Sequence, residues 1–308
     1  MCRQFPLSLR SLRSAVILVL AGFGFALETS AQAPGGAASR ADDAKALYDV
    51  GRRYARGDGV QKDYTKAAQY LLKSASEGYA DAQTDLGALY TRGQGVKLDF
   101  QEAFKWYQRA ALQGDPLAQY ALGIAYFNGR GVAKDLRQAL VWWRKAAEQN
   151  QVEAQNDVGQ LYFRGDGTGA SNPLQNYPEA ARWLQKAAER GYVRAMNNLG
   201  FLYEHGLGVE KSYVEAAKWY QAGAERGEPK AQANLGVLYQ EGKGQPRDIV
   251  QAYKWFSLSA VRGDVLGKRY LQEYLDKNIL TPTQRQQAER MVADFSAKPS
   301  TNTTGTLD

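Results

Sequence analysis

The chain of 308 residues contains one cysteine, Cys2, and one histidine, His205. A single cysteine excludes an internal disulfide and a metal site built from several cysteines. The sequence also contains no His-Glu-x-x-His and no Ser-x-x-Lys motif, which are signatures of metalloproteases and of penicillin-recognising serine enzymes. Because no serine or cysteine lies at nucleophile spacing from it, His205 is expected to be a surface residue. These absences favour a protein without a catalytic, metal or cofactor site.

Long apolar runs are also missing, apart from residues 15–27 near the N-terminus. Three arginines precede this run and small residues at 29–31 follow it, a pattern that predicts a cleavable secretory signal peptide over residues 1–31. The run is short for a bilayer span, so no stable membrane insertion is expected after cleavage. We therefore expect a periplasmic or secreted protein.

Cleavage after Ala31 would remove Cys2 and leave 36 Lys and Arg residues against 31 Asp and Glu residues. This excess of positive charge is modest for a nucleic-acid-binding protein, so no nucleic-acid partner is expected. Residues 32–40 are rich in Ala, Gly, Pro and Ser, a composition that predicts a flexible linker over residues 32–43. Order is expected to begin near Asp43.

From residue 44 the chain repeats. A Gly-x-x-Tyr motif recurs every 36 residues, with one interval of 41, at Gly51, Gly87, Gly123, Gly159, Gly200 and Gly236. Three residues after each tyrosine a Gly-x-Gly begins. A phosphate-binding loop needs one such motif after a strand, and no strand pattern precedes any of these. Six copies in a fixed register therefore indicate a turn that belongs to a repeated architecture.

Each unit contains end signals for two helices. A residue that can cap a helix N-terminus opens every second helix: Asp63, Asp99, Asp135, Asn176, Ser212 and Asp248. Five of the six units also carry Glu or Gln three residues later, the spacing of a capping box. The second helix then ends at a residue suited to the left-handed conformation: Gly78, Gly114, Asn150, Gly191, Gly227 and Gly263.

Small and large side chains recur at fixed positions inside these helices. Three positions hold alanine in all six units, which indicates close helix contacts. One position of the second helix holds a large aromatic residue: Tyr70, Trp106, Trp142, Trp183, Trp219 and Trp255. These aromatic side chains are predicted to lie in the core. Trp143 follows Trp142 without repeating a core position, so its replacement by alanine is predicted to cost less stability.

The pattern A-x-x-x-L-G-x-x-Y-x-x-G-x-G-V-x-x-D-x-x-x-A-x-x-W-Y-x-x-A-A-x-x-G, nearly intact in residues 82–114, resembles the Sel1-like repeat, a longer relative of the tetratricopeptide repeat. Two-helix units cannot bury their apolar faces alone and must stack, so an all-α solenoid is expected. The resemblance implies a right-handed α/α solenoid of six repeats at residues 44–79, 80–115, 116–151, 152–192, 193–228 and 229–264.

Beyond the last repeat, residues 264–296 are predicted to form a pair of capping helices, the second opened by a capping box at Thr281. Residues 297–308 are expected to be a disordered tail. Five extra residues within 168–176 lengthen the loop of the fourth repeat. Whether this loop has a function is left open, since toleration is the more common reason for an insertion.

The resemblance implies a non-enzymatic scaffold or adaptor of the bacterial cell envelope that binds another protein. The alternative is a β-lactamase-like or penicillin-binding enzyme of the exported Sel1-like type. Such proteins rely on a disulfide in each repeat, and the mature chain would have no cysteine. Hydrolysis of a chromogenic β-lactam would distinguish the two. The partner, the pathway and the oligomeric state are left open by the sequence.

In the related tetratricopeptide fold the first helices line a concave groove. The corresponding positions here are Tyr120, Ile124, Phe127, Asn128, Asn156, Phe163, Arg164, Asn197, Phe201, Glu204 and His205. We expect Asn156 and Asn197 to lie side by side and to bind the main chain of an extended peptide, while the aromatic side chains supply apolar pockets. The alternative is that these aromatic side chains pack on neighbouring first helices.

Overall fold

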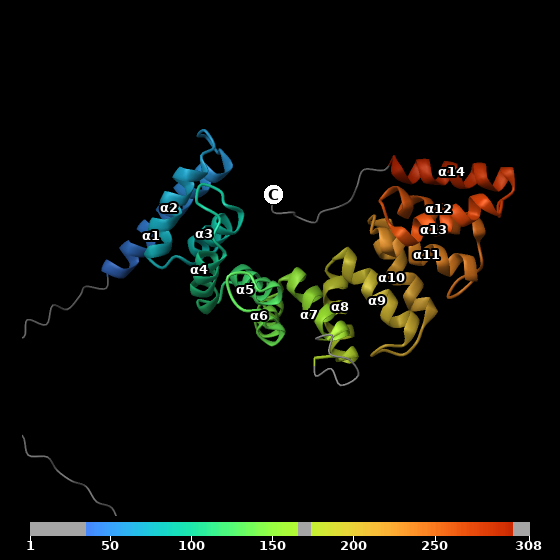
Figure 1. Ribbon diagram of the computed structural model, residues 1–308, viewed down its shortest axis with the longest axis horizontal. Coiled ribbons are helices and arrows are strands. Elements are labelled where there is room, and N and C mark those ends of the chain that lie inside the picture. The colour runs from blue at the N-terminus through green and yellow to red at the C-terminus, as the bar shows by residue number, and fades with distance from the viewer. Residues whose placement is uncertain (1–34, 166–173, 298–308) are drawn as a thin grey trace, which may run out of the picture.

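The computed structural model describes residues 35–165 and 174–297. Within them the chain forms fourteen α-helices and no strand, and the helix pairs follow one another along an arc from α1 to α14 (Figure 1). The predicted all-α solenoid is therefore confirmed. The expected signal peptide, the extra residues of the fourth repeat up to 173 and the tail from 298 lie outside the described residues.

First and second helices alternate along the array. The first helices are α1 (Gly35–Arg56), α3 (Ala80–Arg92), α5 (Pro116–Asn128), α7 (Val152–Arg164), α9 (Val193–His205) and α11 (Pro229–Glu241). The second helices are α2 (Tyr64–Ser76), α4 (Phe100–Leu112), α6 (Leu136–Glu148), α8 (Tyr177–Glu189), α10 (Tyr213–Glu225) and α12 (Ile249–Val261). The last two helices are α13 (Val265–Asp276) and α14 (Pro282–Ser296). From α1 to α13 each helix contacts its neighbours in sequence, as stacked repeats require, and α14 contacts α12.

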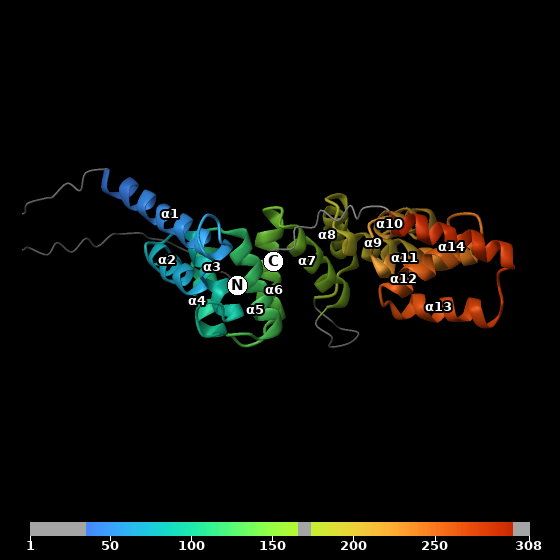
Figure 2. The same cartoon turned by 90° about the horizontal axis from the view of Figure 1, so that it is seen from above.

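The first helix begins earlier than the sequence predicts. α1 starts at Gly35, inside the segment assigned to a flexible linker, and continues to Arg56. Residues 37–41 are Ala-Ala-Ser-Arg-Ala, and the high helix propensity of alanine and arginine extends the helix once Pro34 is passed. Figure 2 shows this extension projecting beyond the array. The linker prediction is wrong for residues 35–43.

Each second helix begins and ends where the sequence predicts. All six cap side chains accept hydrogen bonds from first-turn N–H groups; Asp99 Oδ1, for example, accepts from the N–H groups of Gln101 and Glu102 at 2.9 and 3.0 Å. All six residues predicted to follow the helix have positive φ, including Asn150 at 71°. These two signals fix the length of every second helix.

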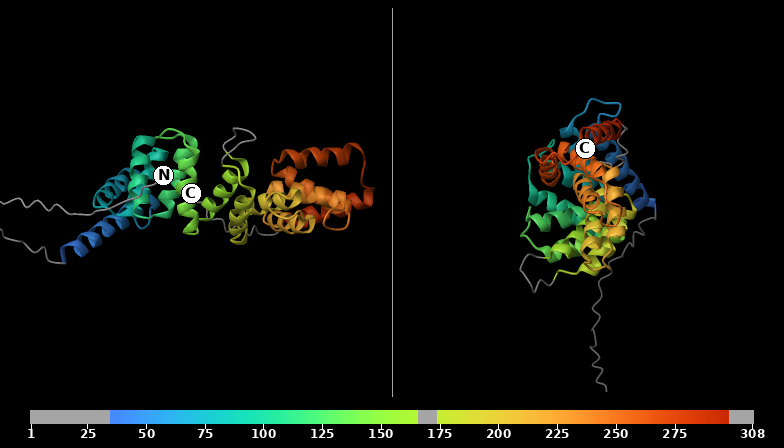
Figure 3. Two further views of the ribbon diagram at one scale, coloured as in Figure 1. Left: turned by 90° about the horizontal axis from the view of Figure 1, so that it is seen from below. Right: turned by 90° about the vertical axis from the view of Figure 1, so that its right-hand side faces the viewer.

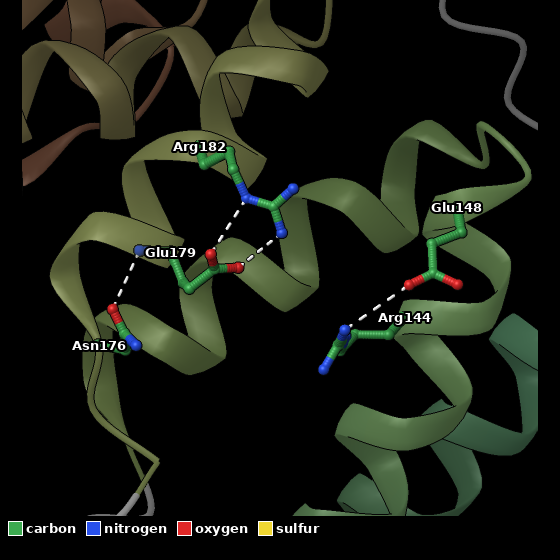
Figure 4. Close-up of polar contacts among 5 residues, drawn as sticks. All are labelled: Arg144, Glu148, Asn176, Glu179 and Arg182. Atoms are coloured by element: carbon green, nitrogen blue, oxygen red, sulfur yellow. Dashed lines mark hydrogen bonds and ion pairs between the residues drawn. The ribbon is translucent and has the colours of Figure 1, made fainter.

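The capping boxes predicted for the repeats do not form. The N–H of each cap residue, which a capping-box side chain would bind, instead donates to the carbonyl of the Gly-x-x-Tyr tyrosine at 2.8 to 3.1 Å. In the fourth repeat, Glu179 turns outward and accepts two hydrogen bonds from Arg182 at 3.2 and 2.7 Å (Figure 4). The cap N–H groups thus join the two helices of a repeat, and among the described helices a complete capping box occurs only at Thr281 of α14.

Successive repeats pack through a glycine of the Gly-x-Gly loop. The second glycine lies against the backbone that opens the preceding second helix, and a Cβ on Gly131 would lie 2.0 Å from the Phe100 carbonyl oxygen. Gly95, Gly208 and Gly244 make the same approach. In the first repeat, where no repeat precedes, Gly59 has no such neighbour and Ala46 is exposed. The loop glycines therefore allow repeats to stack.

A second glycine contact closes each repeat internally. The glycine of Gly-x-x-Tyr lies against a large side chain of the second helix, one of Leu71, Tyr107, Trp143, Leu184, Tyr220 and Phe256. A Cβ on Gly123 would lie 2.1 Å from the Trp143 ring. Trp143 is 4% exposed and Trp142 is 9% exposed, so Trp143 is a core residue, and the premise for expecting a smaller loss of stability from its replacement is wrong. Because this position of the second helix holds leucine, tyrosine, tryptophan or phenylalanine in different repeats, a search for recurring residue types does not identify it as a core position.

The C-terminal helices close the array. α12 lies between α13 and α14 and contacts both (Figure 2). Phe295 of α14 packs edge-on against Trp255, with ring centroids 5.4 Å apart, so α14 covers part of the last repeat. Figure 3 shows the resulting elongated array from below and from its C-terminal end. None of the helices within residues 35–165 and 174–297 is long and apolar enough to cross a bilayer.

The outward side of the second helices carries charges that already have partners. Arg144 and Glu148 of α6 approach to 3.7 Å, and Arg182 and Glu179 of α8 to 2.7 Å (Figure 4). Lys145 lies 4.1 Å from the centroid of the Trp142 ring, and Arg109 and Lys186 cover the corresponding rings at 4.4 and 4.5 Å. Exposed pairs of this kind stabilise the fold little and remain solvated. The first-helix side is the better place for a ligand site.

Candidate functional site

Neighbouring first helices are joined by hydrogen bonds between side chains. The Tyr120 hydroxyl of α5 donates to Asp157 Oδ2 of α7 at 2.9 Å. Asn234 Nδ2 of α11 donates to Asn197 Oδ1 of α9 at 3.0 Å. These bonds join α5 to α7 and α9 to α11. One pocket lies between α5 and α7, and another lies between α7 and α9.

The first pocket, here the α9 pocket, lies between α7 and α9 and has a volume of about 170 Å³. It is lined by Gln160, Phe163, Arg164, Leu184, Asn197, Asn198 and Phe201. The second, here the α5 pocket, lies between α5 and α7 and has a volume of about 530 Å³. Its lining includes Tyr120, Ile124, Phe127, Asn128, Lys134, Trp143, Asp157, Gln160 and Arg164. Because Gln160 and Arg164 line both, the two pockets share a wall on α7.

The structure brings most of the sequence-predicted residues together. Eight of the eleven line one of the two pockets: Tyr120, Ile124, Phe127, Asn128, Phe163, Arg164, Asn197 and Phe201. Glu204 and His205 line neither. Glu204 Oε2 accepts a hydrogen bond from the buried Tyr220 hydroxyl at 2.7 Å, and the exposed His205 ring stacks on Phe201 with centroids 4.0 Å apart. His205 thus contacts a lining residue of the α9 pocket, whereas Glu204 joins α9 to α10.

The remaining residue, Asn156, is buried. Its side chain is 1% exposed, and its Nδ2 donates to Asp157 Oδ1 at 3.0 Å. Asn156 lies two residues after Ala154, at a position that the structure places in the contact between repeats. The expected pair of Asn156 and Asn197, side by side on an open surface, is therefore wrong. Asn197 itself is occupied by its bond from Asn234.

The aromatic side chains both pack on one another and line the pockets. Phe163 of α7 and Phe201 of α9 meet edge to face, with ring centroids 5.8 Å apart. Phe127 lies 5.2 Å from Trp143 by ring centroids and is 37% exposed. Contacts between α7 and α9 and between α5 and α6 thus hold these rings in place, while part of the Phe127 surface remains available to a ligand.

Several pocket residues escaped the sequence prediction, among them Gln160, Asp157 and Trp143. Gln160, on the wall shared by the pockets, makes no side-chain hydrogen bond in the described part of the chain. It follows Gly159 directly, the position that supplies Ile124 and Phe201 in neighbouring repeats, so the register could have identified it. Asp157 has no counterpart among the predicted residues, and Trp143 was not recognised as repeating a core position. Residues 35–165 and 174–297 contain no cluster of His, Cys, Asp or Glu suited to a metal ion.

Comparison with known proteins identifies the repeat. The Sel1 repeat model matches residues 44–79, 80–115, 116–151, 152–192, 193–228 and 229–264. Comparison with the curated proteins gives no match.

Two solved structures are similar over most of the chain. The protective antigen c5321 of uropathogenic Escherichia coli is 35% identical with a TM-score of 0.72; the match covers 84% of this chain and 55% of that protein. A Sel1 repeat protein of Oxalobacter formigenes is 31% identical with a TM-score of 0.65, over 84% of this chain and 97% of that one. The chain thus spans about half the length of the Escherichia coli protein. With six matched repeats over most of its length, this chain belongs to the Sel1 repeat family.

Proposed function

We propose that this chain is a non-enzymatic scaffold that binds an extended segment of another protein across α7. Sel1 repeats generally form protein-interaction scaffolds and are typically non-catalytic. The observation that carries the proposal is the shared wall: two pockets with aromatic linings meet at Gln160 and Arg164. A peptide laid across this wall would enter both.

An extended peptide suits this arrangement because alternate side chains point to the same side of the chain. Two of them can enter the pockets, where aromatic contacts supply much of the binding free energy. The main chain between them then passes Gln160, whose amide can donate and accept hydrogen bonds and has no protein partner in the described residues. Asn198 contributes a second free donor, since its Oδ1 accepts from Asn197 while its Nδ2 bonds to no described group.

This proposal predicts a specific loss of binding in Gln160→Ala. We expect the variant to bind a peptide selected on the wild-type protein about tenfold more weakly, which is about 1.4 kcal/mol, because the main-chain hydrogen bonds are lost. Fluorescence anisotropy with the labelled peptide measures this. Gln108→Ala on the exposed side of α4 is the matched control and should bind normally. If Gln160→Ala and Gln108→Ala bound the peptide with equal affinity, the proposed binding of a peptide across α7 would be contradicted.

We also propose that the protein acts after export, in the periplasm or outside the cell of a bacterium. The arginines before residues 15–27 and the small residues at 29–31 support this, and both similar solved proteins are bacterial. N-terminal sequencing of the protein recovered from the cell envelope or medium is expected to begin near Gln32. An N-terminus still at Met1 in that fraction would contradict cleavage.

A further inference from the structure

Three aromatic rings surround the α5 pocket. Trp143 stands between Tyr120 and Phe127, with ring centroids 6.5 and 5.2 Å away. The Trp143 Nε1–H donates to the Tyr120 carbonyl oxygen at 3.2 Å and fixes the indole ring. The faces of such rings carry partial negative charge and attract cations, most strongly where water is excluded.

A carboxylate that makes no ion pair with a described residue lies in the same pocket. Asp157 accepts hydrogen bonds from two neutral groups, the Tyr120 hydroxyl at 2.9 Å and Asn156 Nδ2 at 3.0 Å, and makes no ion pair in the described residues. Burial raises the pKa of Asp157, although these hydrogen bonds and the more distant Arg194 oppose the rise and Glu153 adds to it. A partly buried carboxylate that makes no ion pair is stabilised when a cation reaches it.

Positive charge lines the pocket at other points. Lys134 is exposed, and its Nζ lies 5.9 Å from the centroid of the Phe127 ring. No carboxylate partner of Lys134 occurs among the described residues. On α7, Arg164 lies two turns beyond Asp157, about 10 Å along the helix axis. The pocket therefore presents a negative group at Asp157 and a positive group at Lys134, with apolar and aromatic surface between them.

We propose that the α5 pocket binds a basic side chain of the peptide, lysine or arginine, that has a carboxylate next to it. The inference rests on the proposed peptide-binding function. The ammonium or guanidinium group pairs with Asp157, the aliphatic stem packs on Trp143 and Phe127, and the carboxylate pairs with Lys134. That carboxylate is either the C-terminus of the peptide or the side chain of an adjacent Asp or Glu.

A synthetic random peptide library with free C-termini tests both levels of the proposal. Peptides are selected on the mature protein, residues 32–308, and in parallel on Gln160→Trp, in which a bulky side chain obstructs the shared wall. We expect the wild-type-specific peptides to contain Lys or Arg beside a carboxylate. Specific peptides without a basic residue would overturn this inference and leave the peptide-binding function standing. If no peptide distinguishes the wild type from Gln160→Trp, the proposed function fails as well.

The best lysine-containing peptide is then resynthesised with norleucine, which keeps the aliphatic stem and removes the charge. We expect at least tenfold weaker binding to the wild type, and no such difference in Asp157→Asn. Two further peptides, one with an amidated C-terminus and one with the adjacent acid changed to its amide, show which carboxylate pairs with Lys134, because removing that carboxylate should weaken binding to the wild type. In Lys134→Gln the same change of the peptide should leave the affinity unaltered. The norleucine peptide serves as the folding control for both variants. Equal affinity of the lysine and norleucine peptides for the wild type would overturn the inference.

Discussion

Replacing Trp143 by alanine is expected to lower the free energy of unfolding by about 3 to 5 kcal/mol, the range for truncation of a large buried aromatic side chain. The indole fills the space opposite Gly123, where a Cβ would come within 2.1 Å of the ring. Its Nε1–H also donates to the Tyr120 carbonyl oxygen. Alanine would leave a cavity between α5 and α6 and would remove the hydrogen bond that joins α6 to the Tyr120 carbonyl oxygen.

Trp142→Ala is the matched comparison, because the two tryptophans are adjacent on α6. The repeat pattern alone ranks Trp142 as the more important residue. The structure indicates that Trp143→Ala lowers the free energy of unfolding at least as much as Trp142→Ala. Trp142 is 9% exposed and covered by Lys145, whereas Trp143 is 4% exposed and packs inside its own repeat. Urea titrations followed by circular dichroism give both midpoints. A midpoint for Trp143→Ala clearly closer to the wild type than that of Trp142→Ala would contradict this reading of the core.

The elements of the fold could be predicted because their signals are local and repeated. A cap residue such as Asp99 and a left-handed residue such as Gly114 act within one helix end, so each recurs whenever that end recurs. The capping boxes failed for the opposite reason. Their N–H groups are taken by tyrosine carbonyls of the first helix, a contact between helices that spacing along one helix cannot reveal.

The lining of the two pockets was predicted in outline, but the depth and partners of individual side chains were not. Transfer of positions from a related fold found Phe127, Phe163 and Phe201, because a residue's face on a helix follows from its register. The register of a residue along its helix does not tell how deeply its side chain is buried between helices. Asn156 and Asn197 hold equivalent positions, yet one is sealed against Asp157 while the other bonds to Asn234 in the next repeat. The neighbouring helix therefore decides which amide side chain is left without a hydrogen-bond partner among the described residues. In the pockets that amide is Gln160.

Gly131→Ala is expected to destabilise the protein by about 2 to 5 kcal/mol, and the same change at Gly59 by about 1 to 2 kcal/mol. Both glycines are the second glycine of their loop and have similar backbone angles, with φ of 74° and 69°. Alanine therefore costs about 1 to 2 kcal/mol at either position through the left-handed conformation. The two sites differ only in what lies opposite.

At Gly131 the new Cβ would meet the Phe100 carbonyl oxygen at 2.0 Å, whereas at Gly59 the nearest group is the flexible end of Arg53 at 3.5 Å. Backbone cannot move aside as a side chain does, so the second and third repeats must separate, which adds the cost of overpacking, typically about 1 to 3 kcal/mol. Urea midpoints of the two variants, with similar circular dichroism at low urea, measure this difference. Equal losses would mean that the Gly-x-Gly loop is needed only for its own turn, and that repeat stacking does not depend on the close approach of these backbones.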